Sequence, residues 1–309
     1  MSATPGESAM TGAAVPVEPP PPRPRKDGFW HDLRRHRGGL FGLVVFGAFL
    51  VLAVAGSVIA PFDPDSGNLI VSLTPPSATH WFGTDELGRD VLSRIVDGAR
   101  IAVVVALLSV AIAMVVGVLI GIVAGYYGGI VDTVLIRSQD VLFAFPTLLL
   151  AIIVVAVLGP GLLNAVLAIA IVYIPRFARI ARATALTVRS SEFLDAARLA
   201  GTRETTILVR HMLPNVLPAV IVLAALSMST AQLAYASLSF LGLGVSPPQA
   251  DWGSMLSKAR DFVTFAPWLV IFPSAALVLL MLAFNVLGDA VRDVMDPRNE
   301  AAGPNVTSV

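Results

Sequence analysis

The chain contains 309 residues, of which 56% are hydrophobic and only 14% are charged, whereas a soluble globular domain carries about 25% charged residues. This composition argues against a soluble protein and favours one embedded in a membrane. Lysine plus arginine and aspartate plus glutamate each total 21, and cysteine is absent, which argues against nucleic-acid binding and excludes disulfides, thiolate metal sites and cysteine nucleophiles.

The N-terminal residues 1–37 predict a basic, disordered cytoplasmic segment. They contain a proline run at 19–22 among small residues, together with six lysine or arginine side chains. Such a composition buries too little apolar surface to fold. The apolar stretch that follows, 38–62, is longer than the roughly 7 to 15 apolar residues of a signal peptide, so we expect an uncleaved transmembrane helix.

Five stretches of the chain contain no Asp, Glu, Lys or Arg, and each is long enough to cross a bilayer, which takes about 20 apolar residues. The stretch that begins at Val141 is too long for one span and contains Gly159-Pro160-Gly161, a turn sequence that ends one helix and allows another to begin. The sequence therefore predicts an all-α membrane protein. Its six expected transmembrane helices lie near residues 40–60, 100–124, 141–158, 162–181, 216–240 and 267–288.

Basic residues indicate that both termini are cytoplasmic. Cytoplasmic loops retain lysine and arginine, and the N-terminal segment and the loop between the fourth and fifth helices are the two richest in them. The arginines of that loop are Arg176, Arg179, Arg182, Arg189, Arg198, Arg203 and Arg210. The chain then divides into a cytoplasmic segment 1–37, a first helix 38–62, an external loop 63–99, a five-helix core 100–291 that includes the loop 190–214, and a cytoplasmic tail 292–309.

The end of the external loop predicts an amphipathic helix at the membrane surface. Thr84 or Asp85 is placed to cap it, because both side chains can accept a hydrogen bond from the first helical turn. Its apolar face would meet the membrane and its charged face water, with Leu87, Val91, Leu92 and Ile95 on the first and Arg89, Asp90 and Arg94 on the second.

The second transmembrane helix carries glycine every four residues, at Gly117, Gly121 and Gly125. This spacing produces a smooth face on which another helix can approach closely. The partner helix is either one of this chain or one of another subunit.

Residues that would carry chemistry are missing from the sequence. The charge-free stretches hold no ionisable group for a proton relay or voltage sensor, and no phosphate-binding loop, H-E-x-x-H or G-x-S-x-G motif occurs. The four histidines, at 31, 36, 80 and 211, lie in different loops. We therefore assign no catalytic, cofactor or metal residue and expect any energy source to act from outside the membrane.

The cytoplasmic loop 190–214 predicts two short helices. Ser190 or Ser191 can cap the first, and Glu192 and Asp195 in its first turn favour the positive end of the helix dipole. Gly201 is placed to end this helix in the left-handed conformation.

The second short helix of this loop would begin with Thr202 as its cap and stop at Pro214, just before the fifth transmembrane helix. The first helix presents a small surface that a groove on a partner could admit closely. Packing on the chain's own bundle is the alternative. The residues of that surface are Ala196, Ala197 and Ala200.

The same loop resembles the EAA loop of bacterial ABC-importer permeases, which inserts a coupling helix into a cleft on a cytoplasmic ATPase. The resemblance is carried by Asp195-Ala196-Ala197, by Gly201 four residues later and by Leu213-Pro214. The family usually has glutamate where this chain has Asp195, whose carboxylate reaches one methylene less far. The resemblance implies an ATPase contact made by Glu192, Asp195, Ala196, Ala197, Ala200, Gly201, Thr202, Leu213 and Pro214.

A second stretch, His80 to Arg94 followed by Gly98-Ala99-Arg100, resembles the segment before the second helix in the C-type permeases of dipeptide, oligopeptide and nickel importers. The likeness extends from about Gly38 to Pro297. It implies a type I ABC-importer permease fold with several passes through the bacterial cytoplasmic membrane. The external segment, either a membrane anchor or a contact for a binding protein, comprises Gly83, Thr84, Asp85, Gly88, Arg89 and Asp90.

These resemblances imply one transmembrane subunit of an ATP-driven importer, working with a second, B-type permease, two ATPase subunits that bind ATP and magnesium, and an external binding protein. Peptides are favoured over nickel as the substrate because the spans offer no histidine or carboxylate ligand. A nickel importer is one alternative. A self-sufficient channel or carrier, in which the loop around Gly201 would be dispensable, is another. A structural scaffold is a third, and loss of uptake in a Gly201 variant would count against it.

Overall fold

The computed structural model describes residues 37–295, which are almost entirely helical outside the external loop. The predictions for the N-terminal segment and for most of the C-terminal tail lie outside the described residues. In chain order the helices are α2 (Arg37–Ile59), α3 (Val91–Tyr127), α4 (Gly129–Phe143), α5 (Thr147–Leu158), α6 (Leu162–Arg189), α7 (Glu192–Leu199), α8 (Glu204–Thr206), α9 (Leu213–Phe240), α10 (Trp252–Ala259) and α11 (Trp268–Met295). Shorter turns are η1 (Leu69–Val71), the π-helical turn η2 (Ile207–Met212) and η3 (Arg260–Phe262).

Five helices of the described chain are long and apolar enough to cross a bilayer, namely α2, α3, α6, α11 and a continuous helix that contains α8 and α9. The pair α4 and α5 makes a sixth span if the two are counted together. The predicted all-α membrane fold is therefore confirmed, with one of its six spans bent.

The third span predicted at 141–158 is wrong as a single straight helix. The chain bends by 94° between α4 and α5, and α5 has only 12 residues, about 18 Å. Pro146 precedes α5 directly, and proline disfavours helical backbone in the residue before it, here Phe145. The charge-free run concealed this break because an apolar composition does not require a straight helix.

The second helix is longer than expected, because α3 begins at Val91 and has 37 residues, about 55 Å. Its glycine stripe packs against α6 within the chain. An added Cβ would lie 2.5 Å from Phe177 Cβ at Gly117, 2.4 Å from the Ala178 carbonyl at Gly121 and 2.7 Å from Ala185 Cβ at Gly125. A side chain at any of the three would push the two helices apart.

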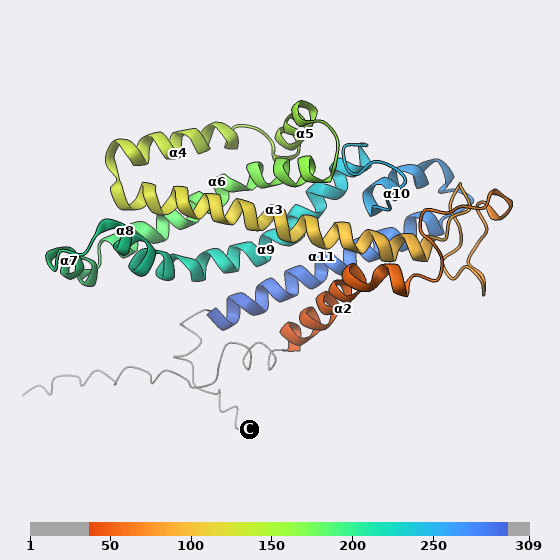
Figure 1. The fold of residues 1–309 in the computed structure, drawn as a ribbon, viewed down its shortest axis with the longest axis horizontal. Helices are drawn as coiled ribbons and strands as arrows, with labels where there is room; N and C mark the ends of the chain where they lie inside the picture. Colours follow the sequence, from red (N-terminus) through yellow and green to blue (C-terminus); the bar gives the residue numbers. More distant parts are fainter. Residues whose placement is uncertain (1–36, 296–309) are drawn as a thin grey trace, which may run out of the picture.

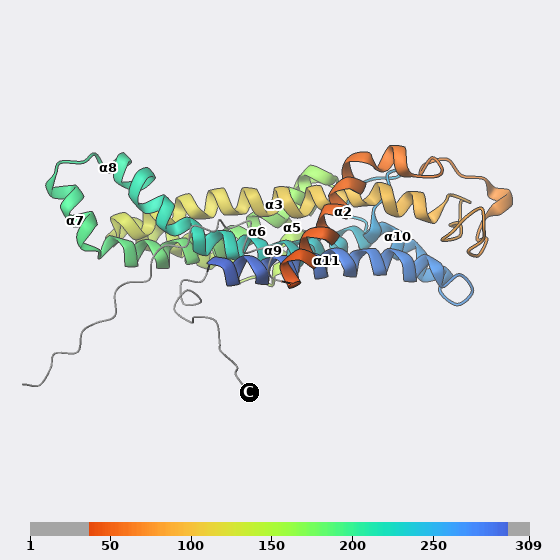
Figure 2. The ribbon, with the colours of Figure 1, turned by 90° about the horizontal axis from the view of Figure 1, so that it is seen from below.

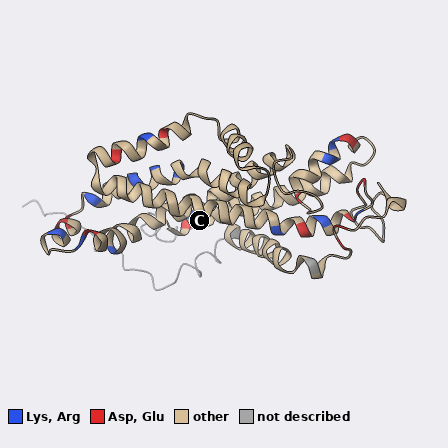
Figure 3. Cartoon of the chain, turned by 45° about the horizontal axis from the view of Figure 1, so that its top comes forward, with Lys and Arg blue, Asp and Glu red and all other residues tan. Residues whose placement is uncertain are grey.

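The bundle is elongated, with α7 and α8 at one end and the external loop and α10 at the opposite end (Figure 1). In the view turned by 90°, α7 and α8 project beyond the other helices (Figure 2). One apolar core joins α3, α6 and α9, and a second joins α2, α3, α10 and α11. Charged residues gather at the two ends and on α4, while the middle of the bundle is nearly free of them (Figure 3).

Candidate functional site

The first helix of the cytoplasmic loop, α7, begins as the sequence indicates, with Ser191 in extended backbone conformation directly before Glu192. The Ser191 side chain does not cap α7 as predicted, because its hydroxyl donates to the carbonyl oxygen of Val188 instead. The Ser191 carbonyl instead accepts from the backbone N–H of Leu194 at 3.1 Å. The serine thus holds the chain at the corner between α6 and α7.

The end of α7 is closed by Gly201, whose φ of +74° lies in the left-handed region. The Gly201 N–H donates to the Arg198 carbonyl at 2.9 Å, and the Thr202 N–H donates to the Ala197 carbonyl at 3.1 Å. These two bonds form a Schellman motif. An added Cβ at Gly201 would meet no atom within 4 Å, so only the backbone conformation favours glycine there.

The second half of the cytoplasmic loop differs from the prediction. Arg203 rather than Thr202 precedes the short helix α8, and no side chain caps it. Pro214 does not stop the helix, which runs unbroken from Glu204 to Phe240. The π-helical turn η2 ends directly before Leu213, so Pro214 lies where the backbone hydrogen-bond pattern changes and a missing N–H is accommodated.

The cytoplasmic loop is attached to the membrane helices at defined points. The side chain of Leu194 is fully buried in the apolar core. The Arg198 guanidinium lies over the ring of Tyr126, 5.4 Å from its centroid, and the Tyr127 hydroxyl donates to the Glu204 carboxylate at 3.0 Å. Both tyrosines end α3, so α7 and α8 rest on the cytoplasmic end of that helix.

The outer surface of α7 is exposed. Leu199 is 91% exposed. Asp195 is exposed too, and among the described residues its ion pair is with Arg198, one turn further along, at 2.9 Å, an interaction of little strength at a surface. Leu199 is not among the residues that the sequence predicts for the ATPase contact, although it directly precedes Ala200, which is one of them.

Of the other residues predicted for the ATPase contact, five are exposed and three are half-buried. The exposed residues are Glu192, Ala196, Ala200, Gly201 and Pro214, and the half-buried ones are Ala197, Thr202 and Leu213.

At the opposite end, the predicted amphipathic helix over residues 84–95 is wrong. Residues 84–90 form a tight loop closed by a bridge between Thr84 and Asp90, and the helix begins only at Val91, with the Asp90 carboxylate accepting from the Ser93 N–H at 2.8 Å. Gly83 and Gly88 have φ of +75° and +70°, a conformation that a right-handed helix does not contain.

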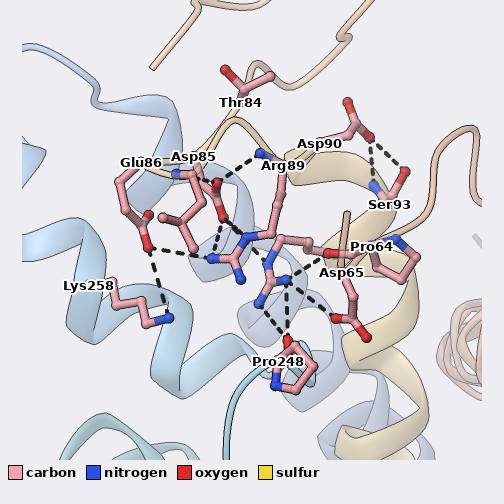
Figure 4. A network of polar contacts seen from close by, with 12 residues as sticks. Pro64, Asp65, Thr84, Asp85, Glu86, Arg89, Asp90, Ser93, Pro248 and Lys258 are labelled. Carbon is pink, nitrogen blue, oxygen red and sulfur yellow. Dashed lines mark hydrogen bonds and ion pairs between the residues drawn. The ribbon is translucent and has the colours of Figure 1, made fainter. Parts of the chain in front are cut away.

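The charged residues expected to face water are instead buried, since Arg89, Asp90 and Arg94 are 4%, 2% and 3% exposed. The Arg89 Nε donates to the Asp85 carboxylate at 2.7 Å. Arg94 donates to the carbonyl of Pro64 at 2.7 Å and lies 3.4 Å from that of Pro248 (Figure 4). This external network therefore joins the loop after α2, the start of α3 and the loop before α10.

Two tryptophans extend the external network to α10 and α11. The indole N–H of Trp252 donates to the Ile95 carbonyl at 3.0 Å, and that of Trp268 donates to the Thr84 carbonyl at 3.3 Å. Asp251, which precedes α10, caps it by accepting from the Ser254 N–H at 3.1 Å. Burial raises the pKa of the Asp251 carboxyl.

The buried charges of the external network are paired with one another and with backbone carbonyls. Within residues 37–295, no three His, Cys, Asp or Glu side chains are grouped so that they could hold a metal ion. The cytoplasmic loop differs from this network, because its outer surface is exposed at Leu199 while Leu194 on its inner side is buried in the apolar core.

The chain is similar to known proteins over most of its length. Residues 117–301 match the family of binding-protein-dependent transport system inner membrane components, and residues 27–76 match the N-terminal transmembrane domain of oligopeptide transport permease C. The chain is 41% identical over 289 residues to the dipeptide transport system permease protein DppC of Alkalihalophilus pseudofirmus, covering 92% of this chain and 95% of that protein. It is 42% identical over 291 residues to the glutathione transport system permease protein GsiD of Escherichia coli O157:H7, covering 94% and 96%.

Among solved structures, a chain of the MetNI methionine ABC transporter in an inward-facing conformation superposes with a TM-score of 0.53 and 19% identity, covering 65% of this chain and 96% of that chain. This likeness concerns the fold alone. Together with the sequence matches, it establishes that the chain has the fold of an ABC-transporter permease and belongs to the family of binding-protein-dependent transport system inner membrane components.

Proposed function

We propose that this permease is the C-type transmembrane subunit of a bacterial ATP-driven importer of di- and oligopeptides in the cytoplasmic membrane. It would pair with a second, B-type permease, rest on two ATPase subunits and receive substrate from an external binding protein. The observation that carries the proposal is the cytoplasmic loop, whose outer surface exposes Leu199 and Asp195 while Leu194 is buried against the bundle.

Such a loop is suited to transmit movement. A force on the cytoplasmic loop acts on α3 through the contact of Arg198 with Tyr126 and through the hydrogen bond of Tyr127 with Glu204, and on the apolar core through Leu194. It also acts on a single helix of 37 residues from Glu204 to Phe240, which is about 55 Å long. Closure of the ATPase dimer around ATP would carry the loop with it and open the spans outward.

Peptides are the proposed substrate class because the named relatives are permeases of dipeptide and glutathione transport systems, and glutathione is itself a peptide. The apolar spans predicted from the sequence, of which the fifth is 216–240, also contain no histidine, the ligand that nickel handled inside the permease would favour. A nickel importer is the alternative to be tested beside it.

The test begins with mild-detergent purification of the tagged chain from its native membrane and identification of what elutes with it. We expect a second six-span permease and ATPase subunits with phosphate-binding loops. In proteoliposomes supplied with the binding protein, labelled dipeptide or glutathione should enter only when ATP is present on the ATPase side. Uptake of nickel and not of peptide would replace the substrate. Transport by the chain alone without ATP would overturn the proposal.

The role of the cytoplasmic loop is tested by Gly201→Val with Gly242→Val as control. Both glycines have left-handed backbone, with φ of +74° and +82°, and both have open space where a Cβ would be, but Gly242 follows α9 at its external end. A strain of about 1–2 kcal/mol would lower the population of the docking-competent loop about tenfold. Uptake should fall in the first variant alone, with protein levels equal in both.

A further inference from the structure

The outward face of α4 is not accounted for by the loop or by the external network. Ile130, Val134, Arg137 and Val141 follow one another at spacings of four, three and four residues, which places them on one side of an α-helix. The three aliphatic side chains are 82%, 61% and 62% exposed, and Arg137 is exposed as well. These four residues are called the α4 stripe.

The opposite side of α4 is fixed to α6 by ion pairs. Arg182 donates two hydrogen bonds to the Asp132 carboxylate, at 2.5 and 2.6 Å, and Arg179 lies 3.2 Å from Asp140. The Arg179 guanidinium also lies over the ring of Phe143, 4.2 Å from its centroid. The helix is therefore held in place although none of its residues is buried, and the α4 stripe is presented outward in a defined orientation.

The direction of α4 restricts what can cover the stripe. The helix runs alongside α3 and α6 rather than across their ends (Figure 1), so it follows the depth of the membrane and does not lie flat on its surface. Its charged residues are visible in Figure 3. A helix in this direction meets lipid, water in a channel, or another protein.

Neither lipid nor water matches the composition of the α4 stripe. An arginine facing hydrocarbon is costly, and within the described part of the chain Arg137 makes no hydrogen bond or ion pair. Water along the stripe would leave Ile130, Val134 and Val141 hydrated. A protein surface with apolar side chains and one acidic group satisfies both parts, because it buries the aliphatic residues and pairs the guanidinium.

We propose that the α4 stripe is the contact surface for the second permease subunit, which presents a carboxylate to Arg137 from one of its own membrane helices. The inference rests on the proposed function, since it requires a second permease. It deepens that function by assigning the face on which the two permeases meet and the charge that aligns them.

The absence of cysteine makes this contact directly measurable. Val134→Cys is labelled with a photoactivatable benzophenone maleimide in the assembled complex in membranes, and the cross-linked product is identified by mass spectrometry. The control is Val278→Cys on α11, where the native valine is 59% exposed, as against 61% at Val134, beside the exposed aliphatic residues Ile271 and Leu282. We expect Val134→Cys to label the second permease and Val278→Cys to label lipid. Labelling of lipid alone, or of an ATPase alone, from Val134 overturns the assignment.

The charge is tested separately by Arg137→Glu and Arg137→Lys, with Arg260→Glu in the external turn as a control for charge reversal. We expect Arg137→Glu to lower the amount of second permease recovered with the tagged chain at least about tenfold, and Arg137→Lys to retain most of it. Arg260→Glu should have no such effect. Equal recovery with Arg137→Glu and with the wild type contradicts the proposed ion pair.

Failure of this inference and failure of the proposed function give different results. If the wild-type chain recovers no second permease at all, the importer assignment itself is wrong. If the wild type recovers it but Val134→Cys does not label it and Arg137→Glu does not release it, the importer assignment holds and only the α4 stripe is excluded as the contact surface.

Discussion

The indole N–H of Trp252 donates a 3.0 Å hydrogen bond to the carbonyl oxygen of Ile95, joining α10 to the first turns of α3. Gly98 lies beneath the same indole, and an added Cβ there would be 2.8 Å from both Trp252 Cδ1 and Nε1. A tryptophan that is 1% exposed cannot move aside without opening the external end of the bundle.

Replacing Gly98 by valine should therefore destabilise the external end. Overpacking of this kind costs about 1–3 kcal/mol, and we expect a lower midpoint of thermal unfolding in detergent. Gly47→Val on α2 is the control, because no atom lies within 4 Å of a Cβ added at Gly47. Equal midpoints for the two variants would show that Trp252 is not held as tightly as the contacts indicate.

The buried pair of Asp85 with Arg89 should be sensitive to the loss of either partner. Asp85→Asn leaves the guanidinium, which is 5% exposed at its side chain, with only the Glu86 carboxylate at 3.4 Å, and removal of one member of a buried pair costs about 3–5 kcal/mol. The comparison is Asp261→Asn, which breaks the exposed pair with Arg260 and should change stability by less than about 1 kcal/mol. Thermal unfolding of the two purified variants measures the difference.

Asp251 should make the stability of the protein depend on pH. Burial raises its pKa, so the folded chain holds this proton more tightly than the unfolded chain does, and stability falls as pH rises above the ordinary aspartate value. Asp251→Asn keeps an acceptor for the Ser254 N–H but cannot ionise. We expect it to be at least as stable as the wild type at neutral pH, with an advantage that shrinks as the pH is lowered toward 4.

An advantage that grows on acidification would reverse the sign and contradict a raised pKa at Asp251. The unfolding midpoints of both proteins are to be compared at several pH values with the buffer's ionic strength held constant. Asp63→Asn, in the exposed turn after α2, controls for the loss of one negative charge at the external end.

Two leucines of α7 should separate stability from coupling. Leu194 is fully buried and Leu199 is 91% exposed. Leu194→Ala should lower stability by about 2–5 kcal/mol, whereas Leu199→Ala should leave the unfolding midpoint unchanged and weaken association with the ATPase. The measurements are thermal unfolding of the chain and recovery of the ATPase with it. Normal ATPase recovery with Leu199→Ala would place the docking surface elsewhere.

Those features of this protein that depend on local composition were predictable from its sequence. Hydrocarbon excludes charge, so charge-free stretches reveal the membrane helices without knowledge of their neighbours. The end of α7 at Gly201 was likewise predictable, because a left-handed residue is required at one position of the chain itself. The family resemblance, carried by the cytoplasmic loop and the stretch before α3, needed no tertiary information either.

Only the tertiary structure shows that the charged residues near position 90 are buried. It also shows which helix packs against the glycine stripe of α3. Arg94 is buried because its partners come from Pro64 and Pro248, remote in sequence, and an amphipathic pattern cannot indicate such partners. The glycine stripe gained its partner in α6, and the ion pairs of α4 with α6 leave Arg137 on an outward face with three aliphatic side chains. A linear pattern records what each residue tolerates, whereas burial and pairing depend on segments that meet only after folding.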